Sequence, residues 1–145
     1  MDFREHDTRI AAYAVVVDED GRVLLALWNE EPEPSWTLPG GGVDFHETVA
    51  EGAIREVREE TGYDVELGRV LGIESFVVPA ERLPAGERPF KSVRVLYEAR
   101  VVGGELANEV GGTTDEARWL PLAEVPSLRR VPLVDAALAL WRGGV

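Results

Sequence analysis

The sequence predicts one layered domain of the α/β or α+β class, built from strands and two helices. The chain has 145 residues, which is the size of a single domain, and 45% of them are hydrophobic. Short β-like runs bounded by glycine or proline recur along it, and two segments show helical periodicity. We find no internal repeat or linker, so we expect a single domain over residues 1–145.

The first two strands are expected on either side of a tight turn. Ile10 to Val17 is an unbroken apolar run, and Asp20-Gly21 suits a hairpin that returns as a partner strand from Val23 to Trp28. The next segment, Asn29 to Ser35, contains two prolines and is expected to be an exposed acidic loop. A short apolar segment, Trp36 to Leu38, then leads to three consecutive glycines.

A helix is expected to begin after Thr48. Thr48 and Glu51 have the spacing of a capping box, and Gly62 is suited to the position just past a helix end. Apolar residues recur at helical spacing on the face that would pack on a sheet, namely Val49, Ala50, Ala53, Ile54 and Val57.

The second half of the chain is expected to hold two strands and a helix. Val70 to Val78 is β-like, Val93 to Val102 alternates in polarity, and Gly103-Gly104 is expected to close a hairpin. The segment between these strands, Pro79 to Phe90, has three prolines and a glycine and is expected to be a long loop. Pro132 to Trp141 has the spacing of a helix with a proline in its first turn.

Composition excludes several classes of site. The net charge of −12 opposes binding to long DNA or RNA, which depends on clustered Lys and Arg. There is no cysteine, so a metal would be held by oxygen or by His6 and His46. The amino-terminal residues do not resemble a secretory signal, and the longest apolar run is far shorter than the roughly 20 residues that span a bilayer, so we expect a cytoplasmic protein with no membrane partner.

Three glutamates share one face of the first helix. Glu56, Glu59 and Glu60 stand at i, i+3 and i+4, with Cβ atoms roughly 5–6 Å apart. Like charges at this spacing cost a few tenths of a kcal/mol per pair. A solvated glutamate-rich surface is the alternative for these three residues taken alone, but the glycine turn before the helix and Arg55 beside the cluster favour a hard divalent cation.

The segment from Gly41 to Tyr63 reads G-x5-E-x7-R-E-V-x-E-E-x-G-Y. It resembles the signature of the Nudix hydrolases, departing from it only at Tyr63, where the family usually has a bulky aliphatic residue. Leu38 to Gly42 and Ala117 to Val125 also resemble the family. The resemblance implies a MutT-like fold, a Nudix-type α/β/α sandwich with a mixed central sheet.

The same resemblance implies a metal-dependent pyrophosphohydrolase that breaks a diphosphate linkage by water attack at phosphorus. The substrate would be a small nucleoside diphosphate derivative: a free or damaged nucleotide, ADP-ribose or a nucleotide sugar. Mg²⁺ is the expected cofactor, with Mn²⁺ as a substitute. Many relatives are homodimers, which this chain would then resemble. The alternative is a non-catalytic domain of the same fold that senses nucleotides or binds a partner.

The resemblance also assigns roles to single residues. The expected metal ligands are Glu56, Glu59, Glu60 and the carbonyl of Gly40, and Glu47 is expected to pair with Arg55. Glu56 is the first candidate for the general base because Arg55 would orient it. The loop alternatives are Asp115, Glu109 and Glu116, of which Glu116 is favoured.

Substrate-binding residues are predicted from position. Trp36 lies beside the acidic loop and the glycine turn, and core packing is the alternative role for it. Arg82, Arg88, Lys91 and Arg94 are expected to line the approach to the site, with solvated surface charges as the alternative. His46 is expected at the surface or packed in the loop rather than in catalysis.

Overall fold

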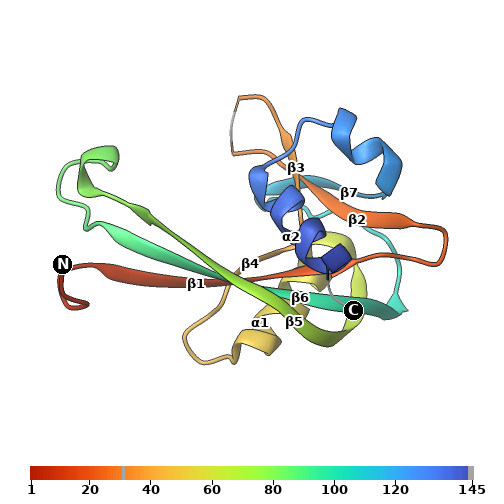
Figure 1. Cartoon of the computed structure of the whole chain (residues 1–145), viewed down its shortest axis with the longest axis horizontal. Coiled ribbons are helices and arrows are strands. Elements are labelled where there is room, and N and C mark those ends of the chain that lie inside the picture. The colour runs from red at the N-terminus through yellow and green to blue at the C-terminus, as the bar shows by residue number, and fades with distance from the viewer. Residues whose placement is uncertain (31, 144–145) are drawn as a thin grey trace.

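The computed structural model describes residues 1–30 and 32–143, which form two sheets and two helices (Figure 1). The larger sheet has the order β4-β1-β6-β5, and the smaller has the order β3-β2-β7. The strands are β1 (Asp7–Val16), β2 (Arg22–Trp28), β3 (Ser35–Thr37), β4 (Gly40–Gly42), β5 (Tyr63–Val78), β6 (Phe90–Gly104) and β7 (Thr114–Pro121), and the helices are α1 (Val49–Thr61) and α2 (Pro132–Gly143). Short 3₁₀ turns, η1 (Ala80–Arg82) and η2 (Leu122–Ser127), complete the elements.

The larger sheet is mixed. β1 runs parallel to β6 and antiparallel to β4, whereas β5 and β6 are antiparallel. All strands of the smaller sheet are antiparallel. None of the helices formed by residues 1–30 and 32–143 is long and apolar enough to cross a membrane.

The two helices cover opposite faces of the larger sheet. Val57 of α1 packs with Ala14 and Val16 of β1, while Val134 of α2 belongs to the core that contains Val15. Since successive residues of a strand point to opposite faces, these two cores lie on the two sides of β1. The predicted α/β/α sandwich with a mixed sheet is therefore confirmed.

Helix α1 has the predicted ends. Thr48 accepts a hydrogen bond from the Glu51 N–H at 3.1 Å while the Glu51 side chain accepts the Thr48 N–H at 2.8 Å, which completes the capping box. Gly62 adopts the left-handed conformation with φ 82°, and its N–H donates to the Arg58 carbonyl. Ile54 was expected in the packed stripe, but it is exposed because the helix turns Ala53 and Val57 toward the sheet instead.

The hairpin predicted at Asp20-Gly21 is present only as a turn with one bridge, and the hairpin predicted at Gly103-Gly104 does not form among the described residues. β2 meets the end of β1 only at a single bridge, Val17 to Val23, and then pairs with β3 and β7. Its apolar residues Val23 to Ala26 are fully buried on both faces, which requires neighbours on both edges and cover on both sides. Gly104 likewise ends β6 opposite Tyr63, and the chain then crosses to β7 in the smaller sheet.

The predicted loops are present with shifted bounds. The acidic loop is exposed at Glu30 and at residues 32–34, and it ends at Ser35, which is buried in β3; Glu31 lies outside the described residues. The segment from Pro79 to Pro89 joins β5 to β6 as predicted. Together with residues 1–9, residues 77–91 form an arm that projects from the body of the molecule (Figure 1).

Candidate active site

Arg55 ties the glycine-rich loop to helix α1. Its Nη2 donates to Glu47 Oε1 at 2.6 Å and to the Gly42 carbonyl at 2.9 Å, and its Nε donates to Glu47 Oε2 at 3.0 Å. The Asp44 N–H also donates to Glu47, at 2.8 Å. The hydrogen bond from Arg55 is the main reason that the pKa of Glu47 is lowered to about 2. The Glu47–Arg55 pairing implied by the motif is thus present, and it fixes the loop before the helix.

Within the described part of the chain, Glu60 is a buried carboxyl group without a basic partner. Its side chain reaches under β4, where the Gly40 N–H donates to Glu60 Oε2 at 3.0 Å, and only 4% of the residue is exposed. Burial raises the pKa of Glu60 to about 9, against the Gly40 hydrogen bond, with further increases from the charges of Glu56, Glu109 and Glu59. Among the described residues, no lysine, arginine or histidine forms an ion pair or hydrogen bond with it.

Glu56 lies between Arg55 and the glycine loop. Arg55 Nη1 donates to Glu56 Oε1 at 3.1 Å, yet burial still raises the pKa of Glu56 above its usual value. A Cβ atom at Gly41 would come within 2.8 Å of the Glu56 carboxyl carbon, so any side chain at this position would displace the Glu56 carboxylate. Glu59, which is half exposed, accepts a weaker contact from Arg55 at 3.3 Å.

This donor set fits a hard cation. Glu56 and Glu60 are carboxyl groups in a partly dry environment with little positive charge to stabilise their ionised forms, and a divalent ion with oxygen ligands would supply that charge. In the described part of the chain, no three acidic or histidine side chains are already gathered at metal-binding distance. Arg55 holds Glu56 and Glu59, and Gly40 holds Glu60, so the carboxylates share a face without forming a closed cage.

The loop before β7 brings Glu109 toward the cluster. The charge of Glu109 raises the pKa of both Glu56 and Glu60, and its carboxylate accepts the Thr114 hydroxyl at 2.7 Å. Glu116, the favoured loop carboxylate from sequence, is instead bonded to Arg118 at 3.0 Å and is not among the charges that act on Glu56 or Glu60. Asp115 accepts a hydrogen bond from Asn29.

A pocket of about 370 Å³ opens beside Glu60. Its walls combine the glycine loop, aromatic side chains and one arginine. The lining residues are Tyr13, Trp28, Glu30, Thr37, Gly40, Gly41, Glu60, Phe76, Arg94, Thr113, Thr114, Val131 and Leu133. Sequence reasoning missed Tyr13, Trp28 and Phe76. The one available signal was Tyr13, a hydroxyl-bearing residue in an otherwise alanine- and valine-rich strand.

Most of the residues predicted to bind substrate do not line this pocket. Of the four arginine and lysine candidates, only Arg94 lines the pocket. Trp36 packs against the core from β3, with the Arg118 guanidinium 5.7 Å from its ring centre. Arg82 and Arg88 lie on the arm, where Arg88 donates to Asp7 at 3.1 Å.

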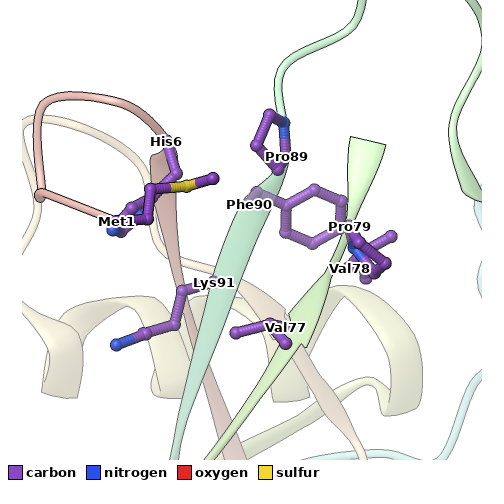
Figure 2. A pocket seen from close by; sticks show the side chains of 8 residues that line it. All are labelled: Met1, His6, Val77, Val78, Pro79, Pro89, Phe90 and Lys91. Carbon is purple, nitrogen blue, oxygen red and sulfur yellow. The ribbon is translucent and has the colours of Figure 1, made fainter. Parts of the chain in front are cut away.

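Lys91 belongs to a second pocket, of about 310 Å³, on the arm. Figure 2 shows Phe90, Pro79 and Val78 forming an apolar wall, while the Lys91 side chain extends away from that wall. Arg82, Arg88 and Lys91 lie away from the pocket beside Glu60 because β5 and β6 extend past that pocket and the loop that joins them lies on the arm (Figure 1). His46 is exposed and packs edge-on against Phe45, with ring centres 4.9 Å apart.

Known proteins match this chain along most of its length. The family model of the NUDIX domain matches residues 7–141. A putative 8-oxo-dGTP diphosphatase from Bacillus subtilis is 32% identical over 82% of this chain and 74% of its own length. An ADP-ribose pyrophosphatase from Methanocaldococcus jannaschii is 32% identical over 78% of this chain, but that match spans only 62% of the archaeal protein.

Solved structures show the same fold. A MutT protein from Methanosarcina mazei superposes with a TM-score of 0.69 and 26% identity, covering 95% of this chain and 96% of that one. A NUDIX hydrolase from Nitrosomonas europaea reaches a TM-score of 0.78 at 20% identity, covering 95% and 90% of the two chains. From the family match over residues 7–141 and these relatives, the chain belongs to the Nudix hydrolase family.

Proposed function

We propose that this Nudix hydrolase is a metal-dependent pyrophosphohydrolase that cleaves the diphosphate linkage of a nucleoside diphosphate derivative. The observation that carries the proposal is Glu60, a buried carboxyl group beside Glu56 that has no basic partner among the described residues. Burying such a group costs free energy of folding, and the binding of a cation would explain why the carboxyl group is there. The relatives named for 8-oxo-dGTP and ADP-ribose support this class of substrate.

The residues proposed to hold the metal are Glu56, Glu59, Glu60 and the Gly40 carbonyl. Mg²⁺, or Mn²⁺ in its place, would neutralise the diphosphate and polarise its phosphorus–oxygen bonds. Arg55 has a positioning role in this scheme, because it holds both Glu47 and Glu56 in place.

The reaction proposed is attack of water on phosphorus. A carboxylate takes a proton from the water while the water oxygen bonds to phosphorus. The bridging P–O bond then breaks and releases two phosphorylated products. Glu56 and Glu109 are the two candidates for this base that lie at the cluster. Glu116 is a weaker candidate because Arg118 already engages its carboxylate.

The test is a substrate panel with purified protein and Mg²⁺, containing oxidised and ordinary nucleoside triphosphates, ADP-ribose, NADH, nucleotide sugars and dinucleoside polyphosphates. We expect turnover of at least one compound and its loss in Glu60→Gln. Glu66→Gln is the matched control, since Glu66 is an exposed glutamate on β5 whose ion pair, within residues 1–30 and 32–143, is with Arg100. A wild-type protein that binds a nucleotide but hydrolyses none of the panel would favour the non-catalytic sensing domain instead.

A further inference from the structure

The loop between β6 and β7 is bonded to the end of helix α1 and to the end of strand β2. The Ala107 N–H donates to the Thr61 carbonyl at 2.8 Å. At the other end of the loop, the Asn29 N–H donates to the Thr113 carbonyl at 2.9 Å. Because Thr61 directly follows Glu60 in α1, the loop passes beside the helix end that carries the glutamate cluster.

Two contacts hold the carboxylate of Glu109 within this loop. The Thr114 hydroxyl donates to Glu109 Oε2 at 2.7 Å, and Thr114 is only 3% exposed. Gly112 lies against the same carboxylate, since a Cβ atom at Gly112 would overlap Glu109 Oε1 and the carboxyl carbon. The φ of Gly112 is not in the left-handed region, so what this glycine supplies is room for the carboxylate.

The hydrogen bond from Thr114 leaves the second oxygen of Glu109 uncommitted. In residues 1–30 and 32–143, Glu109 Oε1 has no hydrogen-bond or ion-pair partner. Thr114 lines the pocket beside Glu60, and the charge of Glu109 raises the pKa of both Glu56 and Glu60. The uncommitted oxygen therefore belongs to a carboxylate at the edge of this pocket.

Glu56, the other candidate for the general base, is more heavily engaged. Arg55 Nη1 donates to Glu56 Oε1 at 3.1 Å, and Glu56 is also one of the proposed metal ligands. Positive charge beside a carboxylate favours its ionised form and so makes it a weaker acceptor of protons. Glu109 has no arginine partner among the described residues and is not in the proposed ligand set.

We propose that Thr114 is a positioning residue for hydrolysis, whose hydroxyl holds Glu109 so that Glu109 Oε1 takes the proton of the attacking water. The inference rests on the proposed function and selects Glu109 as its base. While the proton passes to Oε1, the water oxygen bonds to phosphorus and the bridging P–O bond breaks. The Thr114 hydroxyl keeps its own proton, because it only donates a hydrogen bond to Oε2.

The loss of a positioning hydroxyl should cost less activity than the loss of the base. General bases contribute factors of about 10² to 10⁴, and small misplacements of a reacting group lower the rate by part of that. In Thr114→Val the Glu109 carboxylate remains but loses its hydrogen bond. We therefore expect kcat to fall roughly 10-fold. KM should change less than about 2-fold, because the hydroxyl is bonded to Glu109 and not to substrate.

The experiment is a double-mutant cycle with Mg²⁺ and the best substrate of the panel. Thr114→Val, Thr114→Ser and Gly112→Ala are measured alone and combined with Glu109→Gln. Thr114→Ser keeps the hydroxyl and should stay within about 3-fold of the wild-type kcat. Gly112→Ala keeps the hydroxyl but displaces the carboxylate, so its kcat should fall as in Thr114→Val. In the Glu109→Gln background, Thr114→Val and Gly112→Ala should each lower kcat by less than about 2-fold more.

Ser127→Ala is the control for losing a hydroxyl. The Ser127 hydroxyl also donates at 2.7 Å, but to the backbone carbonyl of Glu124 in η2. Its removal should leave kcat and KM unchanged. Melting temperatures identify a folding defect in Thr114→Val, in which case Thr114→Ser and Gly112→Ala decide.

Three results would overturn the inference. Equal losses of kcat for Thr114→Val in both backgrounds would show that Thr114 acts through the fold and not through Glu109. Unchanged kcat in both Thr114→Val and Gly112→Ala would show that the position of Glu109 does not matter. A higher Mg²⁺ requirement in Thr114→Val, with the wild-type kcat at saturating Mg²⁺, would assign Glu109 to the metal.

Failure of the proposed function gives a different result. In that case wild type hydrolyses no compound of the panel, and the role of Thr114 fails with it. If wild type is active and Glu60→Gln is not, while Thr114→Val and Gly112→Ala keep full activity, only the role of Thr114 fails.

Discussion

Two pockets of this molecule, the one beside Glu60 and the one on the arm, are similar in volume and opposite in chemistry. The one beside Glu60 is lined by two carboxylates, an arginine, three aromatic rings and two glycines, whereas the one on the arm is lined mainly by apolar side chains with His6 and Lys91 at its edge. Several of the cations predicted from sequence to meet a phosphorylated substrate lie on the arm. We therefore expect the substrate to react near the helix carboxylates rather than where loop cations are most numerous.

The sharpest way to test that comparison is to remove a carboxylate that reaches the cluster. Glu109→Gln should lower kcat about 100-fold or more if Glu109 is the general base, since such groups contribute factors of this size. Glu116→Gln, a carboxylate of the same segment held by Arg118, should change kcat less than about 2-fold.

Steady-state kinetics with Mg²⁺ and the best substrate of the panel distinguish these outcomes. If Glu116→Gln has the large effect and Glu109→Gln the small one, the loop carboxylate chosen from sequence was the correct one. If neither variant is impaired, Glu56 is left as the base.

A methyl group at Gly41 should disturb the reactive end without touching the arm. In Gly41→Ala the new Cβ would meet the Glu56 carboxylate at about 2.8–3.0 Å, so Glu56 must move. We expect kcat to fall roughly 10-fold, because small displacements of catalytic groups are costly. Gly143→Ala at the end of α2 is the control, since no atom lies within 4 Å of a Cβ placed there and its φ is not in the left-handed region. Equal activity of both variants would contradict a close fit at Glu56.

Glu60 should also make stability depend on pH. The pKa of Glu60 is about 9 in the folded protein without metal and 4.5 in the unfolded chain. Between these two pH values the folded state retains a proton that the unfolded state has released. The stabilisation is therefore full below about pH 4.5 and is lost as pH rises toward 9, by about 1.4 kcal/mol per unit at the steepest. Glu47 has a pKa of about 2 in the folded protein and 4.5 in the unfolded chain, so at pH 6 and above it is ionised in both states and adds no slope there.

Thermal unfolding of metal-free protein at pH 6 and pH 8.5 measures this effect. We expect a smaller loss of Tm with rising pH in Glu60→Gln than in wild type. Mg²⁺ should raise the Tm of wild type more at pH 8.5 than at pH 6, because binding to the folded state favours the ionised carboxylate. Identical pH profiles for the two proteins would mean that Glu60 is ionised in the folded state without metal.

The helix and its glutamate cluster could be predicted from residues close together in the sequence. The pairing of strands that are distant in the sequence could not. The capping box at Thr48, the end at Gly62 and the Glu47–Arg55 pair depend on residues within one short segment. The partners of β2 and the crossing from Gly104 to β7 depend on contacts far apart in sequence. A turn signal such as Asp20-Gly21 fixes the reversal of the chain and leaves the sheet that receives the next strand undetermined.

The same limit explains why the pocket residues were missed. Tyr13, Trp28, Phe76 and Arg94 come from four different strands, and only the fold brings them to one cavity. Arg94 was predicted together with Arg82, Arg88 and Lys91 as one group of charges. The structure separates them: Arg94 lines the pocket beside Glu60, whereas Arg82 and Arg88 lie in the loop that precedes β6 and Lys91 lies near the first residue of β6.

The smallest change in activity is expected from replacing the cations of the arm. A triple variant, Arg82→Gln, Arg88→Gln and Lys91→Gln, should change KM and kcat less than about 2-fold, because these side chains lie on the arm and exposed charges act weakly at a distance in physiological salt. Arg88 loses its exposed pair with Asp7, which is worth about 0–1 kcal/mol, so the fold should tolerate the change. The KM and kcat of the triple variant and of wild type are measured at low and at physiological ionic strength. A KM that rises several-fold at physiological salt would show that these cations bind the substrate. The proposed difference in role between the two pockets would then be contradicted.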